Sequence, residues 1–248
     1  MKIMSYNLRN GGGKKHNLWQ KMISEFSPDI VFAQESRHPR SYFDTKAFAE
    51  FKDCIHANVP THEQWGSAIL SRHHRLIQVS LSQPEYAGWV VGAMVPDFAI
   101  GGKTQSVLLF SIHAPTLPGR SYEGHIERIL GEIASRWRDT PMVIAGDFNL
   151  TTAISRPQSA LGENTEGELR LLKMLRGDLS LVNAWQHLHP DEDLPQTLRW
   201  SSDKSIPFHC DAIFLNTNHL PQLVHASVES DGDWGTMSDH NPILVTLE

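Results

Sequence analysis

Polar side chains able to bind metal or transfer protons stand at the ends of several strand-like segments in this 248-residue chain. Burying one unpaired carboxylate costs several kcal/mol, roughly, so a lone acid is normally tolerated only at a turn. Each residue alone has a structural explanation, such as an Asx-type turn for GDFN. Together, at strand ends that could converge on one edge, they favour a functional site. The residues are Asn7, Glu35, His113, Asp147, Asn149, His209, Asp211, Asp239 and His240.

The first chemistry that these side chains suit is the binding of a hard metal ion. Mg²⁺ prefers oxygen ligands, usually one or two carboxylates together with amide oxygens and waters. Asn7 and Glu35 can supply such oxygens. Thiolates or clustered imidazoles, which are typical of zinc sites, are not evident in the sequence.

The second chemistry is attack on phosphorus. Asp147 with its neighbour Asn149 can hold and deprotonate an attacking water and stabilise the phosphorane-like oxygens. His240, oriented by Asp211, can donate to a phosphate oxygen. The alternative for the SDH stretch is purely structural, as a turn that closes the core before the last strand.

The segments between these residues alternate between strand-like and helical patterns without a repeat or a linker-like break. Many strands with few helices predict two sheets packed face to face with helices outside, in one α/β domain over residues 1–248. Helices are predicted for Leu18–Phe26, Glu123–Trp137 and Glu166–Arg176. Strands are predicted for Ile3–Leu8, Asp29–Glu35, Gly66–Arg72, Gly88–Val95, Ser106–Ala114, Pro141–Asn149, Cys210–Asn216, Leu223–Glu229 and Ile243–Leu247.

Composition narrows the class of protein. The formal charge is −6 and 40% of the residues are hydrophobic, which disfavours a passive DNA-binding module but not an enzyme that holds a metal. Cys54 and Cys210 form no disulfide framework. No apolar run reaches membrane-spanning length and the N-terminus lacks a signal-peptide pattern, so we expect a cytoplasmic protein that does not associate with membranes.

Seven motifs in fixed order resemble the endonuclease/exonuclease/phosphatase superfamily of metal-dependent hydrolases. These are SYNLR, DIVFAQE, GSAILSR, SIHAP, VIAGDFN, HCDAIFL and SDHNPI, which together span almost the whole chain. The GDFN or SDH stretch alone is a weak signal, whereas the ordered set is specific. The resemblance implies a four-layer α/β sandwich, with two central mixed β-sheets flanked by helices and the site at one edge of the sheets.

The resemblance also implies roles for individual residues. Asn7 and Glu35 correspond to ligands of Mg²⁺, for which Mn²⁺ can substitute, and Asp239 lies near the metal or its waters. Asp147 corresponds to the residue that activates or positions water. Asn149 corresponds to its partner at the phosphate.

Two positions separate the branches of the superfamily. The carboxylate–histidine dyad, to which Asp211 and His240 correspond, is common to all branches. The first position that differs is in SIHAP, which carries His113 where abasic-site endonucleases have tyrosine. Deoxyribonuclease-like, sphingomyelinase-like and phosphatase-like branches have histidine there, which implies a general-acid or phosphate-contact role. Arg9 replaces an acidic metal ligand of the abasic-site enzymes, so metal binding is expected to rest mostly on Glu35.

The loops that follow the motif strands are basic. Together they hold eleven Lys or Arg and one Asp, which is +10 formally and leaves −16 for the rest of the chain. A positive rim around an acidic site suits a polyanionic substrate, although solvated loops would show the same bias. The two tryptophans among the candidates can stack on bases or pack in a half-buried position. The candidate substrate contacts are Arg9, Arg72, Trp200 and Trp234.

We therefore predict a Mg²⁺-dependent phosphodiesterase that hydrolyses nucleic acid, most simply a DNA endonuclease or exonuclease, without an obligate protein partner. The alternative within the same fold is a phosphatase or lipid phosphodiesterase of the inositol phosphate or sphingomyelin type. A non-enzymatic binding module is the third possibility, and it is the least favoured because every motif residue is present.

Overall fold

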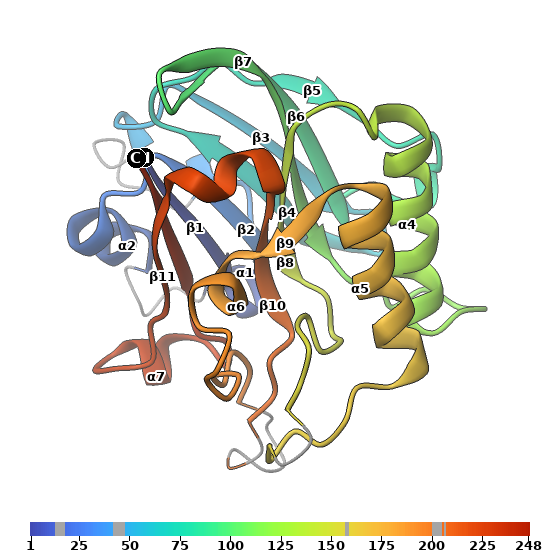
Figure 1. The fold of residues 1–248 in the computed structure, drawn as a ribbon. Helices are drawn as coiled ribbons and strands as arrows, with labels where there is room; N and C mark the ends of the chain where they lie inside the picture. The colour runs from blue at the N-terminus through green and yellow to red at the C-terminus, as the bar shows by residue number, and fades with distance from the viewer. Residues whose placement is uncertain (13–17, 42–47, 157–158, 200–204, 206) are drawn as a thin grey trace.

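The computed structural model describes residues 1–248 except 13–17, 42–47, 157–158, 200–204 and 206 (Figure 1). Over the described residues the strands form two six-stranded mixed sheets. The first sheet has the order β11-β12-β1-β2-β4-β3 and consists of β1 (Lys2–Asn7), β2 (Ile30–Ser36), β3 (Asp53–Val59), β4 (His62–Ser71), β11 (Leu223–Val228) and β12 (Ile243–Leu247). The second has the order β5-β6-β7-β8-β10-β9 and consists of β5 (Ile77–Val79), β6 (Val90–Ile100), β7 (Lys103–His113), β8 (Met142–Asp147), β9 (Leu181–Asn183) and β10 (Asp211–Asn216).

Helices cover the outer faces of both sheets, as Figure 1 shows. Helix α2 (Leu18–Phe26) buries its apolar face on the first sheet, and α4 (Tyr122–Trp137) and α5 (Glu166–Asp178) cover the second. The shorter helices are α1 (Arg9–Gly12), α6 (Ala184–Leu188) and α7 (Trp234–Met237). The expected four-layer α/β sandwich is therefore confirmed. No helix in the described ranges is long and apolar enough to cross a membrane.

Local sequence accounts for the long helices. The side chain of Ser121 accepts a hydrogen bond from the backbone N–H of Gly124 and caps α4. Thr165 and Glu168 form a capping box at the start of α5. In both helices the apolar residues recur at helical spacing and face the sheet, so capping and burial act together.

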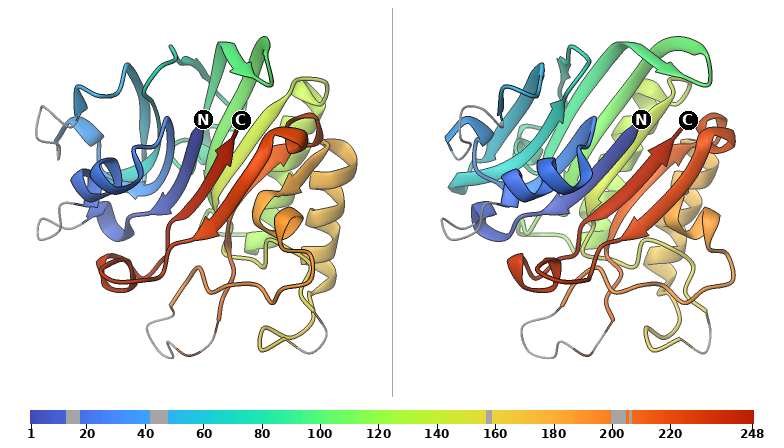
Figure 2. Two further views of the ribbon diagram at one scale, coloured as in Figure 1. Left: turned by 60° about the vertical axis from the view of Figure 1, so that its left-hand side comes forward. Right: turned by 90° about the vertical axis from the view of Figure 1, so that its left-hand side faces the viewer.

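Strand direction decides where the polar strand ends meet. Strands β1 and β2 are parallel, and so are β7 and β8, so the carboxyl ends of each pair lie at one end of its sheet. Strands β12 and β10 run antiparallel to β1 and β8, so they begin at that same end. The two chain termini lie together at the opposite end (Figure 2). Both sheets therefore present their candidate catalytic and metal-binding residues at one end of the sandwich.

Candidate active site

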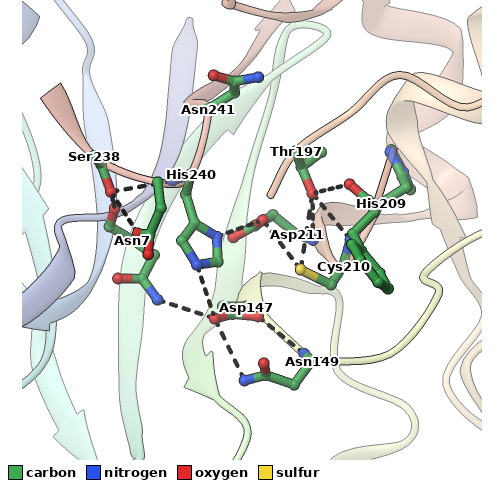
Figure 3. Close-up of polar contacts among 12 residues, drawn as sticks. Asn7, Asp147, Asn149, Thr197, His209, Cys210, Asp211, Ser238, His240 and Asn241 are labelled. Carbon is green, nitrogen blue, oxygen red and sulfur yellow. Dashed lines mark hydrogen bonds and ion pairs between the residues drawn. The ribbon is translucent and has the colours of Figure 1, made fainter. Parts of the chain in front are cut away.

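Asp147, the last residue of β8, lies at the centre of a buried polar cluster (Figure 3). Its Oδ2 accepts a hydrogen bond from Asn7 Nδ2 at 2.9 Å, and its Oδ1 accepts one from the Asn149 backbone N–H at 2.9 Å. Burial raises the pKa of Asp147 and the Asp211 carboxylate raises it further, while the imidazoles of His240 and His113 oppose the shift. A carboxylate with a raised pKa is suited to accept a proton near neutral pH.

Gly146 allows Asp147 to take this position. Its φ is +144°, and a Cβ atom there would lie 1.8 Å from the carbonyl oxygen of Ile112. Only glycine combines this backbone angle with so close an approach of β7 and β8. The glycine of the GDFN motif therefore sets the packing of the strand that ends in the central carboxylate.

The carboxylate–histidine dyad is formed in the structure. His240 Nδ1 lies 2.8 Å from Asp211 Oδ2, and His240 Nε2 lies 3.6 Å from Asp147 Oδ2 (Figure 3). Burial opposes the charged imidazole, but the carboxylates of Asp211 and Asp147 outweigh it and raise the pKa of His240 to about 10. The ring is therefore an imidazolium at neutral pH, with Nδ1 donating to Asp211 and Nε2 facing Asp147.

Glu35 joins the cluster from the first sheet. Its Oε2 accepts a hydrogen bond from the Asn10 backbone N–H at 2.6 Å, and its Oε1 accepts one from Asn7 Nδ2 at 3.3 Å. His113 Nε2 lies 3.8 Å from both Glu35 Oε1 and Asp147 Oδ2. The imidazole of His113 therefore stands between the two carboxylates that belong to different sheets.

Backbone strain is concentrated around these residues. In the part of the chain that the structure describes, six non-glycine residues have positive φ, and Arg9, Asn10, Glu35 and Asn149 are four of them. Such angles cost of order 1–3 kcal/mol each and persist only where the surroundings enforce them. The hydrogen bonds from Asn10 N–H to Glu35 and from Asn149 N–H to Asp147 use these conformations directly.

The donor atoms fit a hard divalent cation on the Glu35 side of the cluster. Asp147, Cys210, Asp211 and His240 offer ligand atoms within 4.8 Å of one another, but Asp211 Oδ2 already accepts from His240. Burial raises the pKa of the Cys210 thiol, so it stays protonated and is a poor ligand. Glu35 instead offers carboxylate oxygens at the cleft, the ligand type that Mg²⁺ prefers. The Asn7 amide turns its Nδ2 toward Glu35, and its Oδ1 accepts from the Arg9 backbone N–H at 2.9 Å.

Asp239 and Arg9 form an ion pair at the rim, with Arg9 Nε 3.1 Å from Asp239 Oδ2. The Arg9 side chain is 54% exposed and lines the cleft. Ser238 Oγ donates to the carbonyl oxygen of Asn7 at 2.8 Å and accepts from the His240 backbone N–H at 3.2 Å. The SDH turn is therefore attached directly to the end of β1, where Asn7 lies.

A cleft of about 610 Å³ opens over the cluster. Its lining combines acidic and imidazole groups with the apolar or aromatic side chains of Trp65, Trp89, Tyr122, Leu198 and Phe208. Trp65 and Trp89 flank the imidazole of His113, with ring centroids 5.6 and 5.1 Å from it. Sequence analysis missed Trp65, although it directly precedes the predicted GSAILSR strand.

Two predicted substrate contacts, Arg72 and Trp234, do not reach this cleft. Arg72 lies at the far end of the first sheet, where Nη1 is 2.8 Å from Glu50, because β4 runs antiparallel to β2. Trp234 is 2% exposed and packs on Tyr6 and Phe26, so its ring has no free face for a base. Trp200 lies outside the described residues.

Comparison with known proteins identifies one family. The model of the endonuclease/exonuclease/phosphatase family matches residues 4–240. A search of curated proteins found no match.

Solved structures with a similar fold include an AP endonuclease from Archaeoglobus fulgidus, with a TM-score of 0.76, 18% identity, and coverage of 100% of this chain and 99% of that one. A 3′ phosphatase NExo from Neisseria, bound to product DNA hairpin, has a TM-score of 0.75 and 18% identity over 100% of this chain and 99% of its own. The 3′-5′ exonuclease NExo from Neisseria meningitidis has a TM-score of 0.74 and 18% identity, with 100% of both chains covered. At this identity the likeness concerns the fold.

Proposed function

Because the chain belongs to the endonuclease/exonuclease/phosphatase family of metal-dependent phosphoesterases, we propose that it is a Mg²⁺-dependent phosphodiesterase that hydrolyses DNA. The observation that carries the proposal is the position of Asp147. Its Oδ2 lies 3.6 Å from the imidazolium Nε2 of His240, which Asp211 orients from the other side. A proton acceptor thus adjoins a cationic proton donor at the base of a cleft. We propose that residues 1–248 act as one catalytic domain, since both sheets contribute to this pair.

Each group has a distinct role in the proposed reaction. Asp147 accepts the proton of the attacking water, and the amide of Asn149 helps to place that water. The imidazolium of His240 donates to a non-bridging phosphate oxygen, where negative charge grows in the transition state. His113, which faces the same cleft, donates to the phosphate or to the leaving oxygen.

Metal binding is assigned to the Glu35 side of the same cluster. Glu35 would hold Mg²⁺, with Asp239 near its waters, and the bound ion would supply charge neutralisation for the substrate phosphate. Asn7 would join as a ligand by turning its Oδ1, which accepts from the Arg9 backbone N–H in this structure, toward the ion. The Asn10 N–H donates to Glu35 Oε2 and fixes that oxygen. The other oxygen, Oε1, accepts from Asn7 Nδ2. Asp147 and Glu35 therefore have separate tasks although Asn7 donates to both.

The aromatic lining of the cleft supports nucleic acid as the substrate. Half-buried Trp65 lines the cleft beside His113 and offers an aromatic surface for a base or sugar next to the reacting phosphate. Base–aromatic stacking contributes about 1–3 kcal/mol per base. Exposed Arg9 stands at the rim, close enough for a neighbouring phosphate to compete with Asp239 for its guanidinium.

A substrate panel tests the proposal. Purified protein is incubated with plasmid, single-stranded DNA, RNA, inositol phosphates and sphingomyelin in the presence of Mg²⁺, Mn²⁺ or excess chelator. We expect cleavage of DNA with either metal and none with chelator. Turnover confined to inositol phosphates or sphingomyelin would establish the phosphatase or lipid-phosphodiesterase alternative, and full turnover in chelator would refute the metal assignment.

A further inference from the structure

The short segment Thr197–Arg199, which we call the strap, lies between the chain segments that carry the two dyad residues, and its Leu198 lines the cleft. Leu198 forms isolated β-bridges with both Phe208 and His240. Phe208 precedes β10 of the second sheet, and His240 precedes β12 of the first sheet. The strap therefore joins the two sheets by backbone contacts at the place where Asp211 and His240 meet.

Arg199 contributes an unusual number of hydrogen bonds to one side of this junction. Its Nη2 donates to the carbonyl oxygens of Ser238 at 2.6 Å, His240 at 3.1 Å and Trp234 at 3.3 Å. Its Nη1 donates to the side-chain oxygen of Asn241. All of these acceptors belong to residues 234–241, the stretch that carries His240.

The backbone of the strap strengthens the same attachment. The Arg199 N–H donates to the carbonyl oxygen of Asp239 at 2.7 Å, and the Asn241 N–H donates to the carbonyl oxygen of Thr197 at 2.7 Å. On the other side, Thr197 Oγ1 accepts from the backbone N–H groups of Cys210 at 2.9 Å and Asp211 at 3.1 Å. Hydrogen bonds thus connect the backbone of both dyad residues, Asp211 and His240, to the strap.

We propose that Arg199 is a positioning residue that keeps the His240 imidazole within hydrogen-bonding distance of Asp211. This inference rests on the proposed function of the same site. The guanidinium is a planar group with five donors in fixed directions, so it can satisfy several carbonyl oxygens that a turn leaves unpaired. Without it the carbonyl oxygens of Ser238 and His240 would turn toward water, and the His240 ring would move with its backbone.

The alternative is that Arg199 only stabilises the fold, and a measurement that needs no substrate separates the two. In protein with ¹⁵N-labelled histidine, the hydrogen-bonded Nδ1–H proton of His240 is observed by NMR and assigned by its loss in His240→Gln. We expect Arg199→Ala to abolish or strongly broaden this resonance while the protein remains folded. An unchanged resonance in folded Arg199→Ala protein would overturn the proposal.

Arg136→Ala is the matched control. Arg136 also donates to a backbone carbonyl, that of Ser80, and to Glu132, but it lies at the far end of α4, about 21 Å along the helix from the cleft residue Tyr122. We expect this variant to lower the melting temperature with the His240 resonance intact. Loss of the resonance in this variant as well would mean that general destabilisation suffices, and the proposal would fail.

Kinetics provide the second readout. Arg199→Ala should lower kcat by roughly 10²-fold, the size expected for a misplacement of about 1 Å, with KM changed less than twofold. In a His240→Ala background the same substitution should cause no further loss, because Arg199 acts through His240. Multiplicative losses would contradict this coupling.

Arg199→Lys addresses the case in which the alanine variant does not fold. Lysine keeps the charge but presents a single donor group, so we expect folded protein with a weakened His240 resonance and an intermediate kcat. A full wild-type resonance and rate in Arg199→Lys would refute the positioning role. If wild-type protein turns over no phosphoester, the proposed function fails, while the NMR comparison still decides whether Arg199 positions His240.

Discussion

Both ends of the β-sandwich carry paired carboxylates and imidazoles, but the central group at the cleft end is buried whereas the His73 imidazole at the opposite end is largely solvated. Asp147, Asp211 and His240 are each at most 5% exposed and contact one another. At the far end His73 pairs with Asp29 while 60% of the His73 side chain is exposed. The chemical types are the same, and only their environment differs.

This difference separates residues that serve stability from residues that serve chemistry. An exposed ion pair contributes about 1 kcal/mol or less, because water solvates both partners in the unfolded state equally well. At the cleft end, buried carboxylates and strained backbone carry a cost that the rest of the fold offsets. We therefore expect substitutions at the cleft end to change turnover and metal binding, and matched substitutions at the far end to change stability alone.

The largest expected effect comes from the dyad. His240→Ala should lower kcat by roughly 10²- to 10⁴-fold with little change in KM, since the contact to phosphate strengthens in the transition state. Asp211→Asn should cost less, because the amide still orients the ring. The double variant should lose far less than the product of the two single losses, as members of one catalytic unit do. Independent, multiplicative losses, measured as rate per folded molecule, would show that Asp211 and His240 do not act as one catalytic unit.

Removal of the metal ligand should come next. Glu35→Gln should weaken Mn²⁺ affinity, measured by titration calorimetry, more than it lowers the free energy of unfolding, because the amide still hydrogen-bonds at that strand end. Activity should fall in parallel and recover partly at high Mn²⁺. The matched control is Glu50→Gln, whose carboxylate pairs with Arg72 at the far end. Unfolding of Glu35→Gln with unchanged Mn²⁺ affinity would make Glu35 a structural residue.

A pair of tryptophans sharpens the comparison within the cleft end. Trp65→Ala should raise KM for DNA by about tenfold through loss of stacking, with a smaller change in kcat. Trp234→Phe should leave KM unchanged and lower stability, because its buried Nε1 donates to Glu25 at 3.0 Å. Steady-state kinetics on oligonucleotides and thermal unfolding distinguish the two. Equal KM values for wild type and Trp65→Ala would exclude the stacking role.

Two buried histidines predict opposite pH dependence of stability. Burial lowers the pKa of His209 to about 4 and the hydrogen bond to the Pro195 carbonyl opposes this shift only in part, whereas the carboxylates around His240 raise its pKa to about 10. The contribution of His240 to the free energy of unfolding is full below about pH 6.5 and is lost as pH rises through 10. That of His209 is full above about pH 6.5 and is lost as pH falls through 4.

Urea unfolding of wild type, His240→Gln and His209→Gln across this pH range checks both signs. The stability gap between wild type and His240→Gln should shrink from pH 7 to 10. The gap to His209→Gln should shrink from pH 6.5 to 4. A gap that widens in either window would contradict the pKa direction assigned to that histidine.

The smallest expected effect is at Arg72. Arg72→Ala removes its ion pair with Glu50 and its contact with the Phe51 ring, so the free energy of unfolding should fall by about 1 kcal/mol. Turnover and KM for DNA should stay at the wild-type values. A raised KM would mean that substrate extends to the far end of the sheet and that the two ends are not functionally separate.

Much of the fold was predictable because its signals are local. The helical spacing of Leu18, Met22 and Ile23 and the apolar runs of the long strands depend only on neighbours in the chain, and these elements are confirmed within a few residues. The strands β3, β5 and β9 were missed. Two of them have only three residues, and β3 is half-buried, so none shows a clear apolar run.

The sequence by itself also determined which residues stand at the ends of the buried strands, and hence the composition of the acidic cluster. Only the tertiary structure decided which loops share an end of the sandwich. Arg72 follows β4, which runs antiparallel to β2, and therefore lies at the far end of the sheet. Trp65 belongs to the same strand but lies at the cleft. Arg199 reaches His240 across 41 positions in the sequence. The physical reason is that strand order and direction come from long-range pairing, which no short stretch of residues encodes.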